Sequence, residues 1–549
     1  MIFKKSLLFV FLLLSHFVFS QNNIPNFYTK SDTLRGSITP ERAWWDLKYY
    51  DLTVKVDPKT KLFSGTNIVH YQVIEPNSVI QIDMQYPMEI QLALQGADTL
   101  NFKKMGKDAY FITLKNRQIA GEIEQLKIVF SGSPKIAKRP PWDGGVQWTK
   151  DSKGIDFIAT SCQELGASVW WPCKDHMYDE PDSMQLAVTV PKGLKDISNG
   201  KLRKVIDNED NTSTFYWFVK NPINNYGVNI NIGNYTNWVE NYKGEKGVLE
   251  LNYYCLPQDY AKAKVQFKEV PRMLKAFEYW FGPYPFYEDG YKLIQAPYLG
   301  MEHQSSITYG NNFANGYLGR DLSGTGWGLL WDFIIVHESG HEWFANNITY
   351  IDIADMWIHE SFTNYSENLF TEYYHGKKAG AEYVIGCRKL IENKYPIIGP
   401  YNVNQSSPGT DKYYKGGNML HTIRQIVNND EKWRGILRGL NAEFYHQTVN
   451  TQQIERYLDE QIPEDLSKIF DQYLRNTSIP VFEYKWKGKA LNYRWINCID
   501  GFKMPLKLDL AEGNLTWLAP TTDWQVYKGK KKVKLKLDEN FYVFSKIKK

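Results

Sequence analysis

The sequence has few cysteines and no close pair of them. Its 549 residues include 5 cysteines: Cys162, Cys173, Cys255, Cys387 and Cys498. So few in a chain of this length exclude a disulfide scaffold, and the absence of Cys-x-x-Cys spacing excludes a cysteine metal knuckle. Their odd number leaves at least one without an intramolecular partner, and the sequence leaves a Cys162–Cys173 bridge open.

Long apolar runs are missing after the N-terminus. Lys4 and Lys5, the apolar stretch Ser6–Leu14 and the small residues before Gln21 predict a signal peptide at residues 1–20. An uncleaved anchor is the alternative, but the stretch is shorter than the about 20 residues of a membrane span. We therefore expect an exported protein, periplasmic or extracellular, with no integral membrane segment after cleavage.

An excess of charge of one sign is missing as well. There are 65 Lys and Arg against 61 Asp and Glu, a net charge of +4, which falls to +2 without Lys4 and Lys5. A nearly neutral chain gives no electrostatic basis for binding nucleic acid or an anionic membrane. In the lysine-rich segment Lys528–Lys549, the alternation of Val533–Leu537 predicts a strand with one solvated face.

The residue patterns change twice along the chain, which is too long for a single core. Alternation in Tyr50–Val56 and Gln185–Val190 predicts strands, which return at Val481–Trp486. Between them, helical periodicity covers residues 259–281, 327–347, 357–374, 378–394, 415–428 and 451–475. The sequence predicts a multidomain α+β protein with a signal peptide (1–20), a β-rich domain (21–237), a mainly helical domain (238–476) and a small β domain (477–549).

The most informative motif is His337-Glu338-Ser339-Gly340-His341, with Glu360 downstream. Two histidines four residues apart share one helix face, so both rings can reach one ion. With Glu360 as third ligand, a fourth position stays open for water, as in catalytic zinc sites. Core histidines and a solvated first-turn glutamate are the alternatives. The paired spacing favours one Zn²⁺ per chain.

Two further glutamates belong to the same helices. Glu338 lies about 100 degrees round the helix from the first ligand, so it flanks the metal and is placed to act as general base. Glu367 follows Glu360 by seven residues on the same face. It either orients a ligand histidine through the second ring nitrogen or is a surface charge.

With these motifs the sequence resembles the zinc aminopeptidases of the aminopeptidase N and leukotriene hydrolase type, which are gluzincin metallopeptidases. The eighteen residues between His341 and Glu360 match that family, and so does Trp-x-x-Glu around Glu360. The resemblance covers most of the mature chain. It implies a saddle-shaped β domain, a thermolysin-like catalytic domain and a small β-sandwich. Many members add a helical domain that closes over the site, and none is visible in this sequence.

Three more segments carry the resemblance to the family. Gly300-Met301-Glu302-His303 is similar to the Gly-x-Met-Glu-Asn loop, which implies that Glu302 holds the substrate amine beside Gly300 and Met301; His303 departs from the pattern. Tyr413-Tyr414-Lys415-Gly416 resembles Tyr-x-Lys-Gly, which implies that Tyr413 stabilises the oxyanion, with Tyr414 as the alternative register. Gln163 stands where the family carries a second amine contact, and an uncommitted loop amide is its alternative.

Together these residues and the resemblance predict a secreted zinc aminopeptidase that hydrolyses the N-terminal peptide bond of peptides with a free N-terminus. An endopeptidase with the same metal chemistry is one alternative, and a catalytically silent peptide-binding module is another. The family also makes epoxide hydrolysis conceivable, although no residue selects it. The sequence leaves the preferred N-terminal residue and the oligomeric state open.

Overall fold

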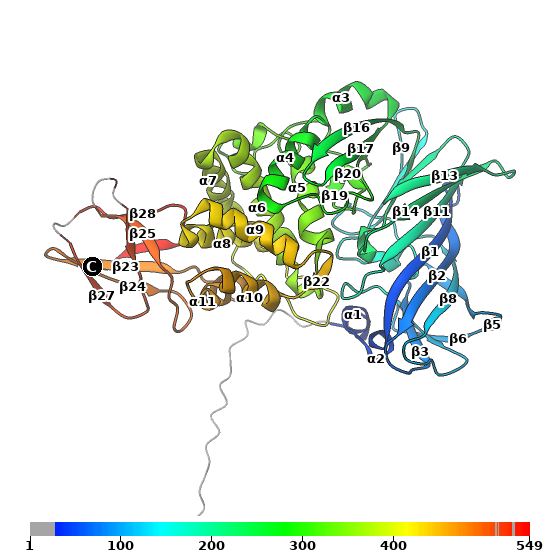
Figure 1. Cartoon of the computed structure of the whole chain (residues 1–549), viewed down its shortest axis with the longest axis horizontal. Helices are drawn as coiled ribbons and strands as arrows, with labels where there is room; N and C mark the ends of the chain where they lie inside the picture. Colours follow the sequence, from blue (N-terminus) through cyan, green and yellow to red (C-terminus); the bar gives the residue numbers. More distant parts are fainter. Residues whose placement is uncertain (1–27, 511–512, 514, 530–532, 549) are drawn as a thin grey trace, which may run out of the picture.

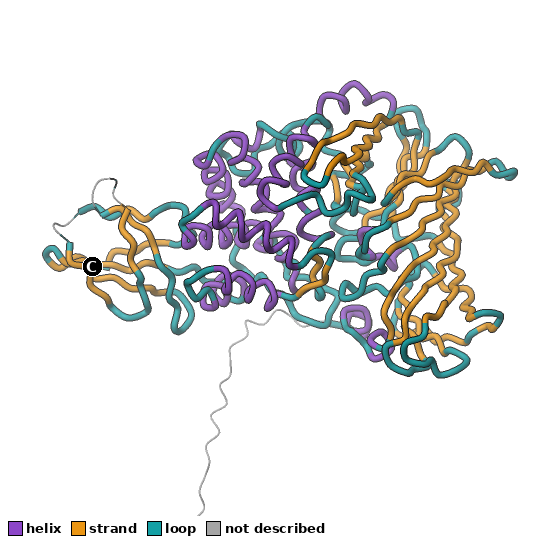
Figure 2. The backbone as a smooth tube through the Cα atoms, viewed as in Figure 1, coloured by secondary structure: helices purple, strands orange, loops and turns teal. Residues whose placement is uncertain are grey.

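The computed structural model describes residues 28–510, 513, 515–529 and 533–548. The predicted signal peptide lies outside these described residues. Within them, no helix is both long enough and apolar enough to cross a membrane. A β-rich region, a helical centre and a smaller β-rich region follow one another along the molecule (Figures 1 and 2). This order confirms the predicted fold class, whereas the exact domain boundaries stay predictions.

The first region is built around strand β1 (Trp45–Asp57), which is antiparallel to β2 (Leu62–Val73) and parallel to β11 (Ser183–Pro191). Along β1, Leu52 and Val54 are buried and Thr53 is exposed, which is the alternation of a half-buried strand. The eight-stranded sheet has the order β13 (Lys201–Asp207), β14 (Thr212–Val219), β11, β1, β2, β8 (Ile123–Gly132), β4 (Glu89–Gln95) and β5 (Asp98–Thr99).

Two smaller sheets and two short helices complete this region. The first sheet has the order β12 (Lys195–Ser198), β15 (Ile230–Gly233), β10 (Asp156–Ser161) and β9 (Gly145–Lys150). The second has the order β3 (Val79–Asp83), β7 (Ala109–Thr113) and β6 (Asn101–Met105). Helices α1 (Lys30–Gly36) and α2 (Pro40–Ala43) precede β1. The end of β10 matters most for function, because Gln163 lies two residues after it.

The central region combines a five-stranded sheet with helices. The sheet has the order β16 (Thr236–Gly244), β17 (Gly247–Cys255), β18 (Tyr291–Gln295), β20 (Ile307–Tyr309) and β19 (Gly300–Met301), so β19 is an edge strand. The helices are α3 (Tyr260–Gln266), α4 (Glu269–Phe281), α5 (Phe333–Gly340), α6 (Trp357–His375), α7 (Lys377–Gly386), α8 (Asp411–Val427), α9 (Asp430–Glu443), α10 (Thr451–Gln461) and α11 (Ser467–Leu474).

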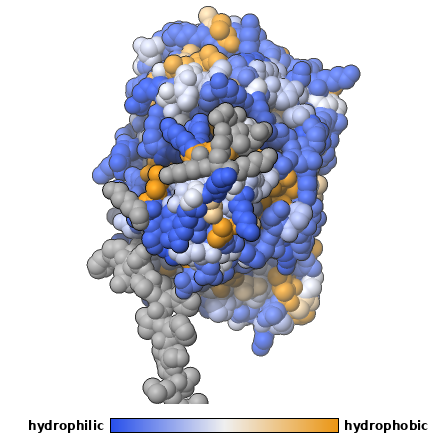
Figure 3. All heavy atoms as spheres, turned by 90° about the vertical axis from the view of Figure 1, so that its left-hand side faces the viewer, coloured by the Kyte–Doolittle hydropathy of each residue, from blue (hydrophilic) through white to orange (hydrophobic). Residues whose placement is uncertain are grey.

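The C-terminal region consists of two small sheets. Their orders are β27 (Gln525–Lys528), β24 (Ala490–Ile496), β23 (Val481–Lys487) and β29 (Phe544–Ile547), and β26 (Leu515–Leu518), β25 (Leu506–Asp509) and β28 (Lys536–Leu537). Its buried side chains, among them Phe482 and Trp495, continue the core of the helical region. The end of the molecule that carries this region is mostly hydrophilic, with separate apolar spots (Figure 3).

Several sequence predictions need correction. The helix predicted over residues 327–347 is shorter: α5 begins after Asp332, whose carboxylate accepts hydrogen bonds from the N–H groups of Ile334 and Ile335. Leu330 therefore lies outside the helix and is exposed. The segment 259–281 splits into α3 and α4, 451–475 splits into α10 and α11, and α7 ends at Gly386.

Other differences concern a missed helix, the C-terminal strand and the cysteines. Helix α9 was not predicted, although Asn429 caps it by accepting from the N–H of Lys432. Of the predicted strand Val533–Leu537 only Lys536 and Leu537 pair. All five cysteines, which lie within the described residues, are free, so Cys162 and Cys173 form no bridge.

Candidate active site

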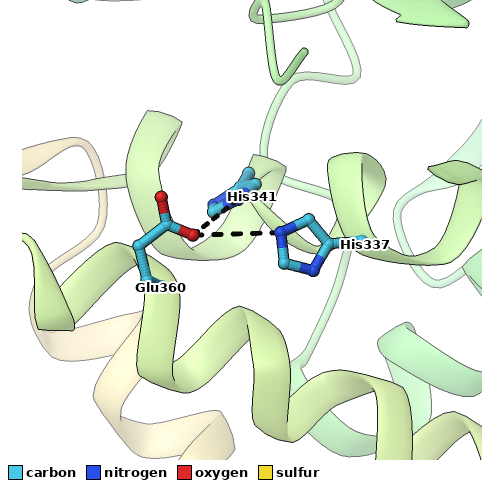
Figure 4. Close-up of side chains that lie close together, drawn as sticks. All are labelled: His337, His341 and Glu360. Carbon is cyan, nitrogen blue, oxygen red and sulfur yellow. Dashed lines mark ion pairs between the residues drawn. The ribbon is translucent and has the colours of Figure 1, made fainter. Parts of the chain in front are cut away.

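Helices α5 and α6 bring the three predicted metal ligands together. His337 lies in α5 and His341 follows its last residue, while Glu360 lies in the first turn of α6. The Nε2 atoms of His337 and His341 are 3.8 Å and 3.5 Å from Oε2 of Glu360 (Figure 4). One side-chain atom from each residue thus points at a common centre, and all three residues are buried.

Hydrogen bonds on the far side of each ring fix this orientation. Nδ1 of His337 is 2.8 Å from Oε1 of Glu367. Nδ1 of His341 is 3.0 Å from the carbonyl oxygen of Phe344 and 3.0 Å from Oγ1 of Thr363. Occupying Nδ1 leaves Nε2 free for an ion, which is the usual arrangement of metal-bound histidine. Of the two readings for Glu367, the structure shows the contact with the ligand histidine.

Glu367 is itself held by residues that the sequence did not single out. The hydroxyl of Tyr383 donates to its Oε2 at 2.8 Å, and Nδ2 of Asn364 donates to its Oε1 at 3.2 Å. Thr363 and Asn364 are three and four residues after Glu360, so they share its side of α6. That spacing was a usable signal for both, whereas Tyr383 comes from α7 and no local pattern indicates it.

The donor set fits zinc. Oε2 of Glu360 is buried and has no hydrogen-bond partner, so a cation would satisfy a carboxylate oxygen that is otherwise unpaired. Burial lowers the pKa of His337 to about 4, which keeps its ring neutral and able to bind a metal at neutral pH. Two imidazole nitrogens and one carboxylate oxygen are the ligands of an open zinc site.

Glu338 lines a cleft together with these ligands. It is buried, and its carboxylate lies within 4.8 Å of the ligand atoms of Glu302 and His341. Burial, followed by the charges of Glu302 and Glu360, holds the pKa of Glu338 well above its usual range. A carboxyl with a raised pKa in a cleft is suited to move a proton.

Strand β19 approaches this glutamate closely because Gly300 has no side chain. A Cβ atom at Gly300 would lie 2.5 Å from Cγ2 of Ile334 and 3.3 Å from Cγ of Glu338. The free edge of β19 therefore runs directly over α5. Met301 is buried in the same strand, and Glu302 follows it. This packing explains a glycine at the start of the loop.

Glu302 accepts hydrogen bonds from two residues of the first region. Nε2 of Gln163 donates to its Oε1 at 2.8 Å, and the hydroxyl of Tyr226 donates to the same atom at 3.1 Å. Gln163 also donates to Oε1 of Glu360 at 3.0 Å. Gln163 is therefore not an uncommitted loop amide, and Tyr226 is a site residue that the sequence did not indicate.

His303, which departs from the family motif, has a hydrogen-bond partner at only one of its two ring nitrogens. It is buried, its Nε2 has no partner, and its Nδ1 lies 3.4 Å from Oγ1 of Thr308. Burial lowers the pKa of His303 to about 3, so the ring is neutral. The substitution therefore adds no charge next to Glu302.

Of the two neighbouring tyrosines, Tyr413 contacts the metal ligands. Its hydroxyl donates to Oε1 of Glu360 at 3.0 Å, and its ring lies 6.1 Å from the ring of His337. Tyr414 contributes to the wall of the cleft. Since Gln163 and Tyr413 both donate to Oε1 of Glu360, its Oε2 stays available for the ion.

Comparison with known families identifies the family to which this site belongs. Residues 266–473 match the peptidase family M1 domain, and residues 47–226 match the peptidase M1 N-terminal domain. The chain belongs to the M1 family of peptidases. The M1 N-terminal domain match carries Gln163 and Tyr226, and the M1 domain match carries the histidine pair, Glu302 and Tyr413. Family membership confirms the resemblance seen in the sequence.

Curated M1 relatives are distant and longer than this chain. A probable aminopeptidase 1 from Saccharolobus solfataricus is 22% identical over 482 residues, which is 83% of this chain and 59% of the relative. Leukotriene A-4 hydrolase from Xenopus laevis is 23% identical over 399 residues, 65% of this chain and 61% of the relative. The chain thus spans about half to three-fifths of the length of these proteins.

Solved M1 structures share the fold. An M1 zinc metallopeptidase from Deinococcus radiodurans, as a mutant bound to a Tyr-Ser-Ala substrate, superposes with a TM-score of 0.65 at 19% identity. The alignment covers 79% of this chain and 95% of that one. The family and the His337–His341–Glu360 cluster together confirm zinc as the cofactor.

Proposed function

We propose that this protein is an exported zinc aminopeptidase, which removes residues from the free N-terminus of peptides. The observation that carries the proposal is the position of Glu302. It is a buried carboxylate that lies beside the metal ligands and faces a cleft with a volume of about 980 Å³. Aminopeptidase names among the relatives and the bound peptide in the Deinococcus structure support it.

The α-amine of the substrate binds Glu302 and Gln163. A buried ammonium group needs a charged acceptor, since desolvation without one costs several kcal/mol. Nδ2 of Asn346 donates to the backbone carbonyl of Glu302 at 2.8 Å, which fixes the loop. A fixed acceptor places the first peptide bond at one distance from the metal ligands, so a single residue is released at a time.

The chemistry of the step is divided among three parts of the site. His337, His341 and Glu360 would hold the zinc ion, which would supply Lewis-acid polarisation of the scissile carbonyl and of the attacking water. Glu338 accepts the proton of the attacking water at its carboxylate and passes it to the leaving amine. The hydroxyl of Tyr413 donates a hydrogen bond to the oxyanion that develops on the carbonyl.

An endopeptidase would have the same metal chemistry but no need for Glu302 at the end of the cleft. The decisive assay compares one tetrapeptide with its N-acetylated form at equal concentration. We expect cleavage of the free peptide, with release of its first residue, and at least about 100-fold slower cleavage of the blocked one. Equal rates would contradict the exopeptidase proposal. No cleavage of either form would favour the peptide-binding module.

Export rests on residues 1–20, which carry the features of a signal peptide. We expect the protein purified from its native host to begin at Gln21 and to occur in the periplasmic or extracellular fraction. Cell fractionation identifies the compartment, and N-terminal sequencing of the material from that fraction identifies the first residue. A mature protein that begins at Met1 would contradict this part of the proposal.

A further inference from the structure

We propose that Trp142 forms a subsite of the cleft that binds an apolar side chain at the second or third residue of the substrate. This inference rests on the proposed function, because it takes the amine-binding end of the cleft as its starting point. Trp142 lies outside the metal site and outside the amine-binding group, and the substrates that it would favour are peptides with an apolar residue shortly after the N-terminus.

The first observation is the exposure of this tryptophan. Trp142 is 59% exposed, whereas Trp170, Trp171 and Trp331 are completely buried. One exposed aromatic residue on a surface needs no explanation, but Trp142 lies in the wall of the active-site cleft. An indole ring that is solvated when the cleft is empty can bury its apolar area against a bound side chain.

The second observation is that the loop around Trp142 is held by its own hydrogen bonds. The carboxylate of Asp143 accepts from the N–H groups of Lys138 and Arg139 at 2.7 Å and 2.9 Å. Nζ of Lys135 donates to the backbone carbonyl of Asp143 at 2.9 Å. A loop closed in this way presents Trp142 in one position, which lowers the entropic cost of using it for binding.

The same loop is packed against the turn that carries Gln163. Gly144 has φ +60, and a Cβ atom there would lie 2.6 Å from Cβ of Leu165. Leu165 and Trp142 line the same cleft. The position of Trp142 is therefore fixed relative to the amine-binding group, which a subsite at a defined distance from the N-terminus requires.

The edge strand β19 gives the direction of the substrate. An extended peptide whose amine is at Glu302 can add to the free edge of β19 and run back past Met301 and Gly300 towards Leu299. Leu299 and Trp142 both line the active-site cleft and also a neighbouring cavity of about 540 Å³, so they form the wall between the two. At about 3.3 Å per residue, and with the first residue of the substrate opposite Glu302, the second and third residues lie opposite Met301 and Gly300, directly before the wall formed by Leu299 and Trp142.

The surroundings of Trp142 favour an apolar side chain. The apolar and aromatic residues that line the cleft include Leu165, Leu299, Tyr317, Leu322 and Phe333. Each oxygen of the neighbouring Asp143 carboxylate accepts a hydrogen bond from a backbone N–H group of its own loop. An aromatic ring beside aliphatic side chains binds Leu or Phe better than Asp.

The test uses two kinds of substrate on the full protein. A simple amino-acid amide, with no group beyond the scissile nitrogen, reaches the amine group but not Trp142, whereas a tetrapeptide with Leu at positions two and three reaches both. For Trp142→Ala we expect KM for the Leu tetrapeptide to rise by about tenfold with kcat nearly unchanged, and the amino-acid amide to keep its KM. The rise for a tetrapeptide with Asp at the same positions should be much smaller, and Trp142→Phe should retain most of the wild-type affinity.

Two controls separate the loss of a Trp142 subsite from a general effect on the protein. Tyr86→Ala removes a 71% exposed aromatic side chain of the same region that does not line the cleft, and it should change neither KM. Calorimetric binding of the Leu tetrapeptide to Glu338→Gln, with and without Trp142→Ala, gives the same comparison without turnover. An unchanged affinity for the tetrapeptide, or an equal loss for the amino-acid amide, would overturn the proposal. Wild type that binds the tetrapeptide through Trp142 but cleaves neither substrate would instead overturn the proposed function.

Discussion

Lys412 and Glu164 form an ion pair of 2.8 Å between Nζ and Oε1 that links the start of α8 to the turn carrying Gln163. Lys412 is buried and immediately precedes Tyr413, while Ser406 donates to the same carboxylate oxygen at 3.0 Å. Glu164 has φ 58, a left-handed conformation that non-glycine residues adopt only when neighbouring contacts hold them. The pair therefore stabilises the turn in the conformation that directs Gln163 towards Glu302.

We expect Glu164→Ala to weaken substrate binding more than catalysis. Without the ion pair the Gln163 turn is less ordered, so KM for free tetrapeptides should rise by about three- to tenfold with kcat within about twofold. Steady-state kinetics measure the split. Asp210→Ala removes an exposed ion pair with Lys55 of 2.7 Å and should change neither constant. A fall in kcat at constant KM would show that the pair acts on Tyr413 instead.

We expect Glu338→Gln to abolish hydrolysis while leaving the metal in place. The amide keeps the size of the side chain but cannot accept the proton of the attacking water, so kcat should fall by at least about 1000-fold. Elemental analysis should still find one zinc per chain. Glu431→Gln, whose side chain is 72% exposed on α9, is the matched control. Retained turnover in Glu338→Gln would contradict its role as the base.

Glu367→Ala tests whether the residue behind His337 stabilises the metal. Loss of the 2.8 Å contact frees the ring and lowers its basicity, so zinc affinity should fall by about 10- to 100-fold. Competition with a chromogenic chelator measures this affinity directly. The less severe Glu367→Gln keeps a hydrogen-bond acceptor and should lose less. An unchanged zinc affinity in both variants would show that Glu367 does not stabilise the metal.

Removal of the metal should lower stability as well as activity. The ion offsets the unpaired, buried Oε2 of Glu360, and binding to the folded chain alone raises its stability by mass action. We expect chelation to lower Tm by several degrees and zinc addition to restore both Tm and turnover. Activity that survives complete chelation would contradict the zinc mechanism.

Asp196, which lies away from the active site, should make stability depend on pH. Burial raises its pKa to about 8, so the folded protein keeps a proton that the unfolded chain releases above about pH 4. The resulting stabilisation is complete below the unfolded pKa and is lost as the pH rises towards about 8. The difference in Tm between Asp196→Asn and wild type should therefore shift by a few degrees in favour of the variant between about pH 5 and 8.

Asp207 provides the opposite case for the same measurement. A hydrogen bond from Ser213 and the ion pair with Lys192 lower its pKa, and the side chain is 61% exposed. Its contribution is already complete above the unfolded pKa, so Asp207→Asn should differ from wild type by a constant amount over that pH range. A growing difference for Asp207→Asn would assign the trend to the whole surface charge instead of Asp196.

The metal site could be predicted from the sequence because its geometry is local. The helical repeat places His337 and His341 on one face, and Glu367 follows Glu360 by two turns. The start of α5 was harder to predict from the sequence. The apolar residues before Asp332 continue the helical pattern, although the helix begins only after its N-cap at Asp332. The hydrophobic pattern alone does not show whether the helix begins at the capping residue or at the apolar residues before it.

The rest of the site depends on contacts between separate elements of the fold, which leave no local pattern. Tyr226 reaches Glu302 from another region of the chain, and Tyr383 reaches Glu367 from another helix. Gln163 and Tyr413 were found only through a resemblance to known motifs. The C-terminal strand was misjudged for a related reason, since alternation at Val533–Leu537 does not supply the neighbouring strand that pairing needs.

Because Gln163 of the first region donates hydrogen bonds to Glu302 and Glu360 of the central region, both regions contribute to the active site. With the proposed function, turnover reports how the first and the central region pack against each other, so a low denaturant concentration should abolish activity before either region unfolds. A fragment that contained only the central region would be a poor scaffold for protein engineering. It would keep the metal ligands but lose Gln163, which helps to bind the amine of the peptide.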